Sequence, residues 1–165
     1  MFDLTGKNAL ITGASGEIGG EIAKSLHRAG AQVALSGTRS APLKELALSL
    51  GCNAHVLLCD LSDLEMVDRL CKEATEAMGS VDILINNAGI TRDNLALRMS
   101  NKEWHDVIDI NLNAVFHVTR ACLKGMMKNR WGRIINISSV IGSIGNTGQT
   151  NYAASKSGVD GFSRA

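Results

Sequence analysis

The sequence lacks the features that mark membrane, secreted or nucleic-acid-binding proteins. Its 17 lysines and arginines nearly balance 16 aspartates and glutamates, for a formal net charge of +1. No strong positive field therefore favours nucleic acid or a membrane surface as a partner. No apolar run approaches the roughly 20 residues of a membrane-spanning helix, and the first residues do not resemble a signal peptide. With 45% hydrophobic residues, we expect residues 1–165 to form one globular domain.

Cysteine, histidine and proline are also sparse. The cysteines, at positions 52, 59, 71 and 122, include no C-x-x-C pair, and no two of the four histidines have the spacing of zinc ligands. The sequence therefore predicts no metal site, and it predicts reduced, partly buried thiols in a cytoplasmic protein. The single proline, Pro42, suits the first turn of a helix.

Short apolar runs alternate with helical patterns along the chain. We expect strands at residues 8–12, 32–36, 54–59, 81–85 and 133–137. Between them we expect helices along residues 18–29, 41–50, 63–78 and 100–129, the last with a Ser100–Glu103 capping box. The strands are continuously apolar, which is typical of a parallel sheet covered on both faces. The predicted fold is therefore an α/β, doubly wound, Rossmann-type domain that binds its ligand beyond the strand carboxyl ends.

The segment after the fifth strand contains a candidate proton-transfer site. Tyr152 is the only tyrosine, and Lys156 follows it at the i+4 spacing, so a helix beginning at Tyr152 would place both on one face. An ammonium group there favours the phenolate, and Ser139, expected at the strand end, could share the substrate oxygen with the phenol. Alternatively, Tyr152 packs at a helix start and Lys156 is a solvated charge.

A glycine-rich turn, TGASGEIGG, follows the first strand and leads into a helix. Backbone N–H groups at such a helix start bind phosphate oxygens, and glycines permit the close approach. Ordinary helix-capping glycines would give a similar pattern. The turn's position in the first strand–helix unit favours the phosphate-binding interpretation.

Together these motifs resemble the short-chain dehydrogenase/reductase family over the whole chain. They are Thr12-Gly13 with Gly19, Asn86 to Gly89, Asn111, Ser139, and Tyr152 with Lys156. Within the family, residues 86–112 and 145–158 most resemble bacterial 3-oxoacyl-[acyl-carrier-protein] reductases.

The resemblance implies NAD(P)H-dependent reduction of a carbonyl group. Tyr152 would donate a proton to the carbonyl oxygen, Lys156 would hold the phenolate and the nicotinamide ribose, and Ser139 would hold the substrate oxygen. Asn111 would anchor a water that relays protons toward Lys156; alternatively, it is a helix-interior asparagine bonded to backbone. Ser138 is the competing serine.

The resemblance also implies a set of cofactor-binding residues. They are Gly13, Ser15, Ile18, Gly19, Thr38, Arg39, Asp60, Leu61, Asn87, Ala88, Gly89, Tyr152 and Lys156. The second strand is followed by Arg39 and by no acid, which favours NADP(H) over NAD(H), although Arg39 could be a solvated loop charge. Asp60 could equally be a strand-end turn residue.

The implied substrate is a 3-oxoacyl group on acyl carrier protein, an acidic partner. Lys124, Lys128, Arg130 and Arg133 cluster at the end of the long helix, and Arg130 matches a family position associated with carrier docking. These charges also suit the helix dipole. The resemblance implies a homotetramer, with no nucleic acid or membrane as partner.

Two departures from the family pattern affect these expectations. The middle glycine of the turn is replaced by Glu17, whose carboxylate would repel a pyrophosphate unless it turns outward. The chain also ends at Ala165, before the family's last two strands, so we expect the fifth strand to be an unpaired apolar edge. Two alternatives therefore remain. The protein could reduce a CoA thioester or another ketone, or it could be a non-catalytic nucleotide-binding module.

Overall fold

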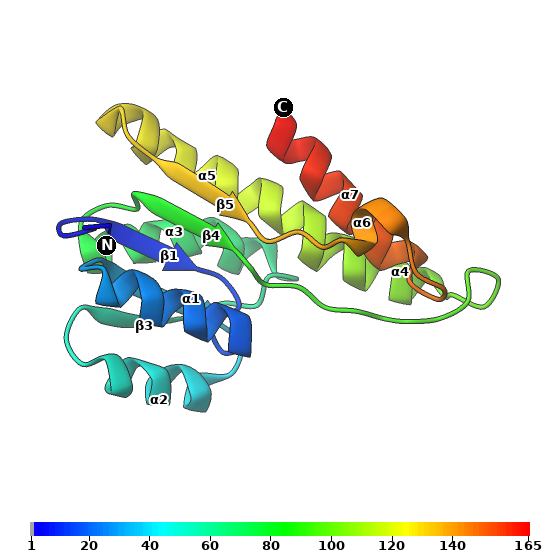
Figure 1. Ribbon diagram of the computed structural model, residues 1–165, viewed down its shortest axis with the longest axis horizontal. Helices are drawn as coiled ribbons and strands as arrows, with labels where there is room; N and C mark the ends of the chain where they lie inside the picture. Colours follow the sequence, from blue (N-terminus) through cyan, green and yellow to red (C-terminus); the bar gives the residue numbers. More distant parts are fainter. Residues whose placement is uncertain (1) are drawn as a thin grey trace.

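Five parallel strands in the order β3-β2-β1-β4-β5 form the centre of the computed structural model, which describes residues 2–165 (Figure 1). The strands are β1 (Asn8–Ile11), β2 (Gln32–Gly37), β3 (Ala54–Leu58), β4 (Ile83–Asn86) and β5 (Arg133–Asn136). The helices are α1 (Glu17–Arg28), α2 (Ser40–Leu50), α3 (Leu64–Met78), α4 (Asn101–Ile108), α5 (Ala114–Asn129), α6 (Ile141–Ile144) and α7 (Thr150–Arg164). A π-helical segment, η1 (Asp109–Asn113), joins α4 to α5. The predicted doubly wound parallel sheet is confirmed.

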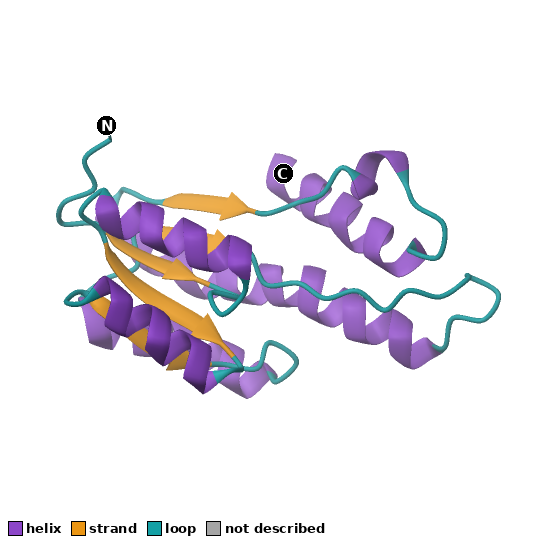
Figure 2. Cartoon of the chain, turned by 60° about the horizontal axis from the view of Figure 1, so that its bottom comes forward, coloured by secondary structure: helices purple, strands orange, loops and turns teal. Residues whose placement is uncertain are grey.

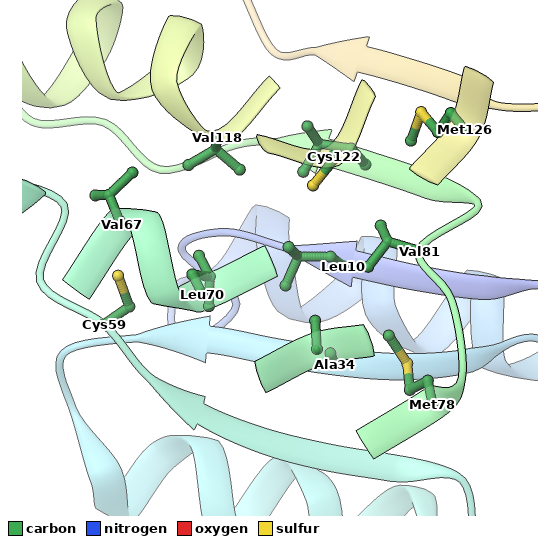
Figure 3. Close-up of a cluster of buried hydrophobic side chains, with 12 residues drawn as sticks. Leu10, Ala34, Cys59, Val67, Leu70, Met78, Val81, Val118, Cys122 and Met126 are labelled. Atoms are coloured by element: carbon green, nitrogen blue, oxygen red, sulfur yellow. The ribbon is translucent and has the colours of Figure 1, made fainter. Parts of the chain in front are cut away.

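Helices cover both faces of the sheet (Figure 2). Leu10 of β1 points toward α3 and α5, where it packs with Leu70 and Val118 (Figure 3). Its neighbours Ala9 and Ile11 point to the other face and belong to the core beneath α1 and α2. Successive strand residues thus enter different cores, which explains why the strands are continuously apolar rather than alternating.

Local capping signals place the helix starts. Asp63 caps α3 by accepting hydrogen bonds from the backbone N–H groups of Glu65 and Met66. Ser100 and Glu103 form both hydrogen bonds of the predicted capping box, and α4 follows directly. These starts follow from short-range hydrogen bonds that the sequence alone specifies.

The structure differs from the sequence-based expectations after β4. The strand begins at Ile83, later than expected. β5 ends at Asn136, so Ser139 lies beyond the strand in a turn that leads into the unpredicted helix α6. The long helix is continuous to Asn129 but contains the π-helical turn of η1. π-turns insert a residue into the helical ladder and are frequent at functional sites.

β5 forms one edge of the sheet, where it pairs with β4 and leaves Ile135 46% exposed. None of the helices formed by residues 2–165 is long and apolar enough to cross a membrane.

Candidate active site

The glycine-rich turn after β1 and the Asn86–Gly89 segment after β4 meet where the strand order reverses. The Thr12 hydroxyl accepts hydrogen bonds from the backbone N–H groups of Asn87 and Ala88, both at 3.1 Å. The Asn87 side-chain amide donates in return to the carbonyl oxygens of Thr12, at 3.0 Å, and Gly13, at 3.2 Å. These reciprocal bonds join the two segments into one rigid edge.

Glycine is required at two points of this junction. Gly13 has a φ of +66°, and a Cβ atom there would lie 2.8 Å from the Ala88 Cα atom. A Cβ atom on Gly19 would collide with the Gly13 carbonyl oxygen and would lie 2.6 Å from the Asn87 amide nitrogen. The glycines therefore allow the turn to approach the β4 segment, in addition to leaving room for a ligand.

A cavity of about 620 Å³ opens over this edge, a size typical of small-molecule sites. Eleven residues expected at the cofactor line it: Gly13, Ser15, Ile18, Gly19, Thr38, Arg39, Asp60, Leu61, Asn87, Ala88 and Gly89. Cys59, Ile90 and Ile110 also line it and were not expected. They carry no recognisable motif, because only their position beside the strand ends brings them there.

The charged residues of the cavity are few. Arg39 crosses from the end of β2 to the glycine-rich turn, where its Nη2 atom donates to the Ser15 carbonyl oxygen at 2.6 Å. Asp60 accepts hydrogen bonds from the Ser62 backbone and hydroxyl, and these bonds hold the pKa of Asp60 below its ordinary value. Arg39 is exposed, but this hydrogen bond anchors it over the turn.

Glu17 is the first residue of α1, exposed in the helix's first turn and also part of the cavity lining. Its carboxylate favours the positive end of the helix dipole. At the same time, the side chain starts at the rim where an anionic ligand would approach.

Tyr152 and Lys156 lie in the first turns of α7, which begins at Thr150. The Lys156 Nζ atom lies 5.7 Å from the centroid of the Tyr152 ring and donates to the Ile137 carbonyl oxygen at 2.7 Å. Lys156 is only 5% exposed, so it is not a solvated surface charge. Burial lowers the pKa of Lys156, and Asp160 partly opposes that shift.

Lys156 also approaches the cavity. A Cβ atom on Gly89 would lie 3.7 Å from Lys156 Nζ and 3.3 Å from Asn111 Oδ1. Gly89 lines the cavity, whereas Asn111, Ser139, Tyr152 and Lys156 are not among its lining residues. Lys156 therefore stands between the cavity and the Tyr152 ring.

Ser139 begins the turn that leads into α6, and its hydroxyl accepts a hydrogen bond from Ile141 N–H at 3.2 Å. α6 packs closely on α7, since a Cβ atom on Gly142 would lie 3.0 Å from the Ser157 nitrogen. The competing hydroxyl of Ser138 is directed at the Lys156 carbonyl oxygen, at 3.4 Å.

Asn111 is fully buried in η1, and both polar atoms of its side chain form hydrogen bonds. Its Oδ1 atom accepts from Ile90 N–H at 2.8 Å, and its amide donates to the Ile90 carbonyl at 2.9 Å and to the Ser155 hydroxyl at 3.2 Å. Asn111 thus joins the cavity wall to α7. The proposed water relay remains a prediction.

Sequence reasoning missed two buried polar residues of α7. Asn151 donates to the carbonyl oxygens of Arg92 and Glu103, while Ser155 donates to the carbonyl oxygen of Tyr152. Both are fully buried. Their signal in the sequence is weak: Asn151 is the second residue of α7, where a polar residue is ordinary, and Ser155 is a single serine in the second turn.

The basic cluster at the end of the long helix lies away from Ser139 and Tyr152. Arg130 follows α5 and lies near the amino end of β5. Ser139 and Tyr152 lie beyond the opposite, carboxyl end of the same strand (Figure 1). The cluster is thus separated from Ser139 and Tyr152 of the same chain, and docking of a partner at Arg130 stays a prediction. The reason for the separation is topological: α5 runs antiparallel to the strands, so its last turn lies far from their carboxyl ends.

Comparison with known proteins gives consistent results. A model of the short chain dehydrogenase family matches residues 7–165. Nodulation protein G of Rhizobium sp. (strain N33) is 52% identical over all of this chain and 67% of its own length. The 3-oxoacyl-[acyl-carrier-protein] reductase FabG of Rickettsia bellii (strain RML369-C) is 48% identical with the same coverage. A solved structure described as a short-chain alcohol dehydrogenase, from Sinorhizobium meliloti 1021, superposes with a TM-score of 0.95 at 34% identity, covering 99% of this chain and 66% of that one.

Proposed function

The chain belongs to the short-chain dehydrogenase family of oxidoreductases, and on that premise we propose that it acts in the NADPH-dependent reduction of a 3-oxoacyl thioester on acyl carrier protein. The observation that carries the proposal is the position of Lys156. Its buried ammonium group lies between the Tyr152 ring and Gly89 at the cavity wall.

The residues of the cavity fit a dinucleotide. Gly13 and Gly19 leave no side chain above the start of α1, where backbone N–H groups and the helix dipole favour a pyrophosphate. Beside Ser15, Arg39 offers a cation suited to a 2′-phosphate, and no acid stands at the end of β2 to bind a free ribose hydroxyl. Bound NADPH would supply the hydride.

The chain's own residues would handle the proton and the substrate oxygen. The Tyr152 hydroxyl donates a proton to the carbonyl oxygen, and the Lys156 ammonium stabilises the phenolate that remains. Ser139 holds the same oxygen by a hydrogen bond. Asn111 and Ser155 position α7, through bonds to the Ile90 backbone and the Tyr152 carbonyl.

A different ketone or a CoA thioester is the second candidate, because Nodulation protein G is as similar to this chain as the carrier-protein reductases are. The two candidates differ in the carrier. Acetoacetyl groups on acyl carrier protein and on CoA should therefore be compared as substrates, with NADPH and NADH, by the loss of reduced-cofactor absorbance. Faster reduction of the carrier-protein substrate with NADPH is expected; no turnover of either thioester would contradict the proposal.

A carrier docked at Arg130 would serve the site of a second copy, because Arg130 lies at the amino end of the strands and Tyr152 beyond their carboxyl end. In the same assay, Arg130→Glu should raise KM for the carrier-protein substrate about tenfold and leave KM for the CoA substrate unchanged, since a basic residue contacting an acidic partner becomes repulsive. Lys128→Glu is the matched control, with the same charge change two residues earlier, in the last turn of α5. Equal rises in KM for both variants would indicate that the carrier protein responds only to the overall charge of this surface and makes no specific contact with Arg130.

We also propose that the chain forms a homo-oligomer, a tetramer by family resemblance, through the outer face of α5 and α7. Phe116, Leu123 and Met127 are 44%, 38% and 73% exposed on one face of α5, and Phe116 packs edge-on against Phe162 of α7. Contiguous exposed apolar residues of this kind are typical of subunit interfaces. Light scattering should show a multimer that Phe116→Glu weakens; a monomeric parent chain would contradict the proposal.

Glu17 is expected to weaken cofactor binding. Its exposed carboxylate at the cavity rim repels phosphate, but solvent screens the repulsion to about 1 kcal/mol or less. Glu17→Gly should therefore bind NADPH up to about fivefold more tightly in a fluorescence titration, with a smaller effect at high salt. Glu21→Gly, one turn along α1 and paired with Lys24 at 2.7 Å, is the control. Equal dissociation constants for the parent and Glu17→Gly would show that the carboxylate turns away.

A further inference from the structure

Two cysteines meet on the sheet face opposite α1 and α2, away from the candidate active site. Cys71 lies on α3 and Cys122 on α5, two helices that pack side by side on the sheet. Cys122 is 1% exposed within the core (Figure 3), and half-buried Cys71 packs against the same cluster. Both line a cavity of about 490 Å³ between the two helices.

This cavity is open to small reagents. Gly125 lines it, and a Cβ atom at that position would meet no other atom within 4 Å. Lys72, Lys124 and Lys128 also line it, together with Asp68 and Glu76, so its wall carries charges of both signs. A small neutral oxidant can therefore reach Cys71 without local unfolding.

The interaction between the two thiols shifts their pKa values in opposite directions. The Cys122 S–H group donates a hydrogen bond to the Cys71 sulfur, which lowers the pKa of Cys71 below its ordinary value. The same contact, together with burial, raises the pKa of Cys122. Cys71 is also the more exposed of the two sulfurs, so it is the thiol that an oxidant in the cavity meets first. By contrast, burial raises the pKa of Cys59 to about 11, so that this thiol stays protonated.

We propose that Cys71 is an oxidant-sensitive modification site, and that its oxidation by a peroxide ends in a disulfide with Cys122 that links α3 to α5. The Cys71 thiolate attacks one peroxide oxygen, the O–O bond breaks, and hydroxide leaves, forming a sulfenic acid on Cys71. The Cys122 sulfur then attacks the Cys71 sulfur, and the S–O bond breaks. The departing hydroxide takes the Cys122 proton and leaves as water. Two thiols are oxidised by two electrons, and one peroxide is reduced to water.

Cys52 provides an internal comparison. It is exposed in the turn before β3, so it would react first if solvent access alone governed oxidation. The proposal predicts the opposite order, because reactivity follows the thiolate fraction as well as access.

The test is a limited treatment of the folded chain with hydrogen peroxide, followed by alkylation of the remaining thiols and mass spectrometry of tryptic peptides. We expect a loss of about 2 Da, for two hydrogens, and a reducible link between peptides 70–72 and 121–124, while Cys52 remains open to alkylation. Oxidation of Cys52 before Cys71, or recovery of Cys71 and Cys122 as separate alkylated thiols, would overturn the proposal.

Variants separate the two steps. Cys122→Ala should accumulate a sulfenic acid on Cys71 that dimedone captures, Cys71→Ala should form no link, and Cys52→Ala should react like the parent. The parent experiment decides the question even where a core variant folds poorly, and repeating it in urea should abolish the preference for Cys71 over Cys52. A preference that persists in urea would show that the folded contact is not its cause, and would also overturn the proposal.

Discussion

Replacing Tyr152 with phenylalanine is expected to lower kcat by about 10²–10⁴-fold, the usual contribution of a positioned general acid. The substitution removes one hydroxyl and keeps the ring, whose centroid lies 5.7 Å from Lys156 Nζ. The measurement is steady-state reduction of an acetoacetyl thioester by NADPH.

The matching controls distinguish chemistry from folding. Tyr152 is half-buried at the start of α7 and contacts the structure mainly through its ring and backbone. NADPH affinity and the melting temperature should therefore change little. If Tyr152→Phe turned over as fast as the parent, the assignment of the proton donor would be wrong. If it unfolded, the loss of activity would say nothing about proton transfer, and Ser139→Ala would serve as the second test of the same oxygen site.

Asn111→Ala is expected to produce the largest loss of stability, about 3 kcal/mol. The substitution removes three hydrogen bonds and leaves the N–H and C=O groups of Ile90 without their partner. A loss of this size lowers the melting temperature of a chain of this length by roughly 6–12 °C. Thermal unfolding followed by circular dichroism measures it.

Asn113→Ala is the matched control in the same π-helical segment. Asn113 is exposed, and its amide contacts only Asp109 of its own segment, at 2.8 Å. Its replacement should change the melting temperature by about 1 °C or less, since exposed polar contacts contribute little. Equal shifts for both variants would indicate that Asn111 contributes only its helix propensity, and that the bridge from Ile90 to α7 is unimportant.

Local sequence signals predicted most of the sheet and many of the helix starts. The five apolar runs became five parallel strands, and the three central ones, β1, β2 and β4, are buried on both faces, as expected of continuous apolar segments. The Ser100–Glu103 capping box was likewise predictable, because its hydrogen bonds span only three residues.

The parts that were not predicted depend on contacts between distant segments. The π-turn at Asn111 has no local signal, because its side chain bonds to Ile90 and Ser155 on other segments. The burial of Asn151 beside Tyr152 depends on the carbonyl oxygens of Arg92 and Glu103, far away in the chain.

By itself, the sequence determined the order of strands and helices, the family, and the residues that were candidates for binding and chemistry. Those follow from apolar periodicity, capping and motif spacing, which act over a few residues at a time. The tertiary structure alone decided which candidates meet. It brings eleven of them around one cavity, buries Lys156 between Gly89 and Tyr152, and separates Arg130 from that site. The physical reason is that parallel strands gather their carboxyl ends at one edge, while buried polar groups find hydrogen-bond partners only where distant segments pack together.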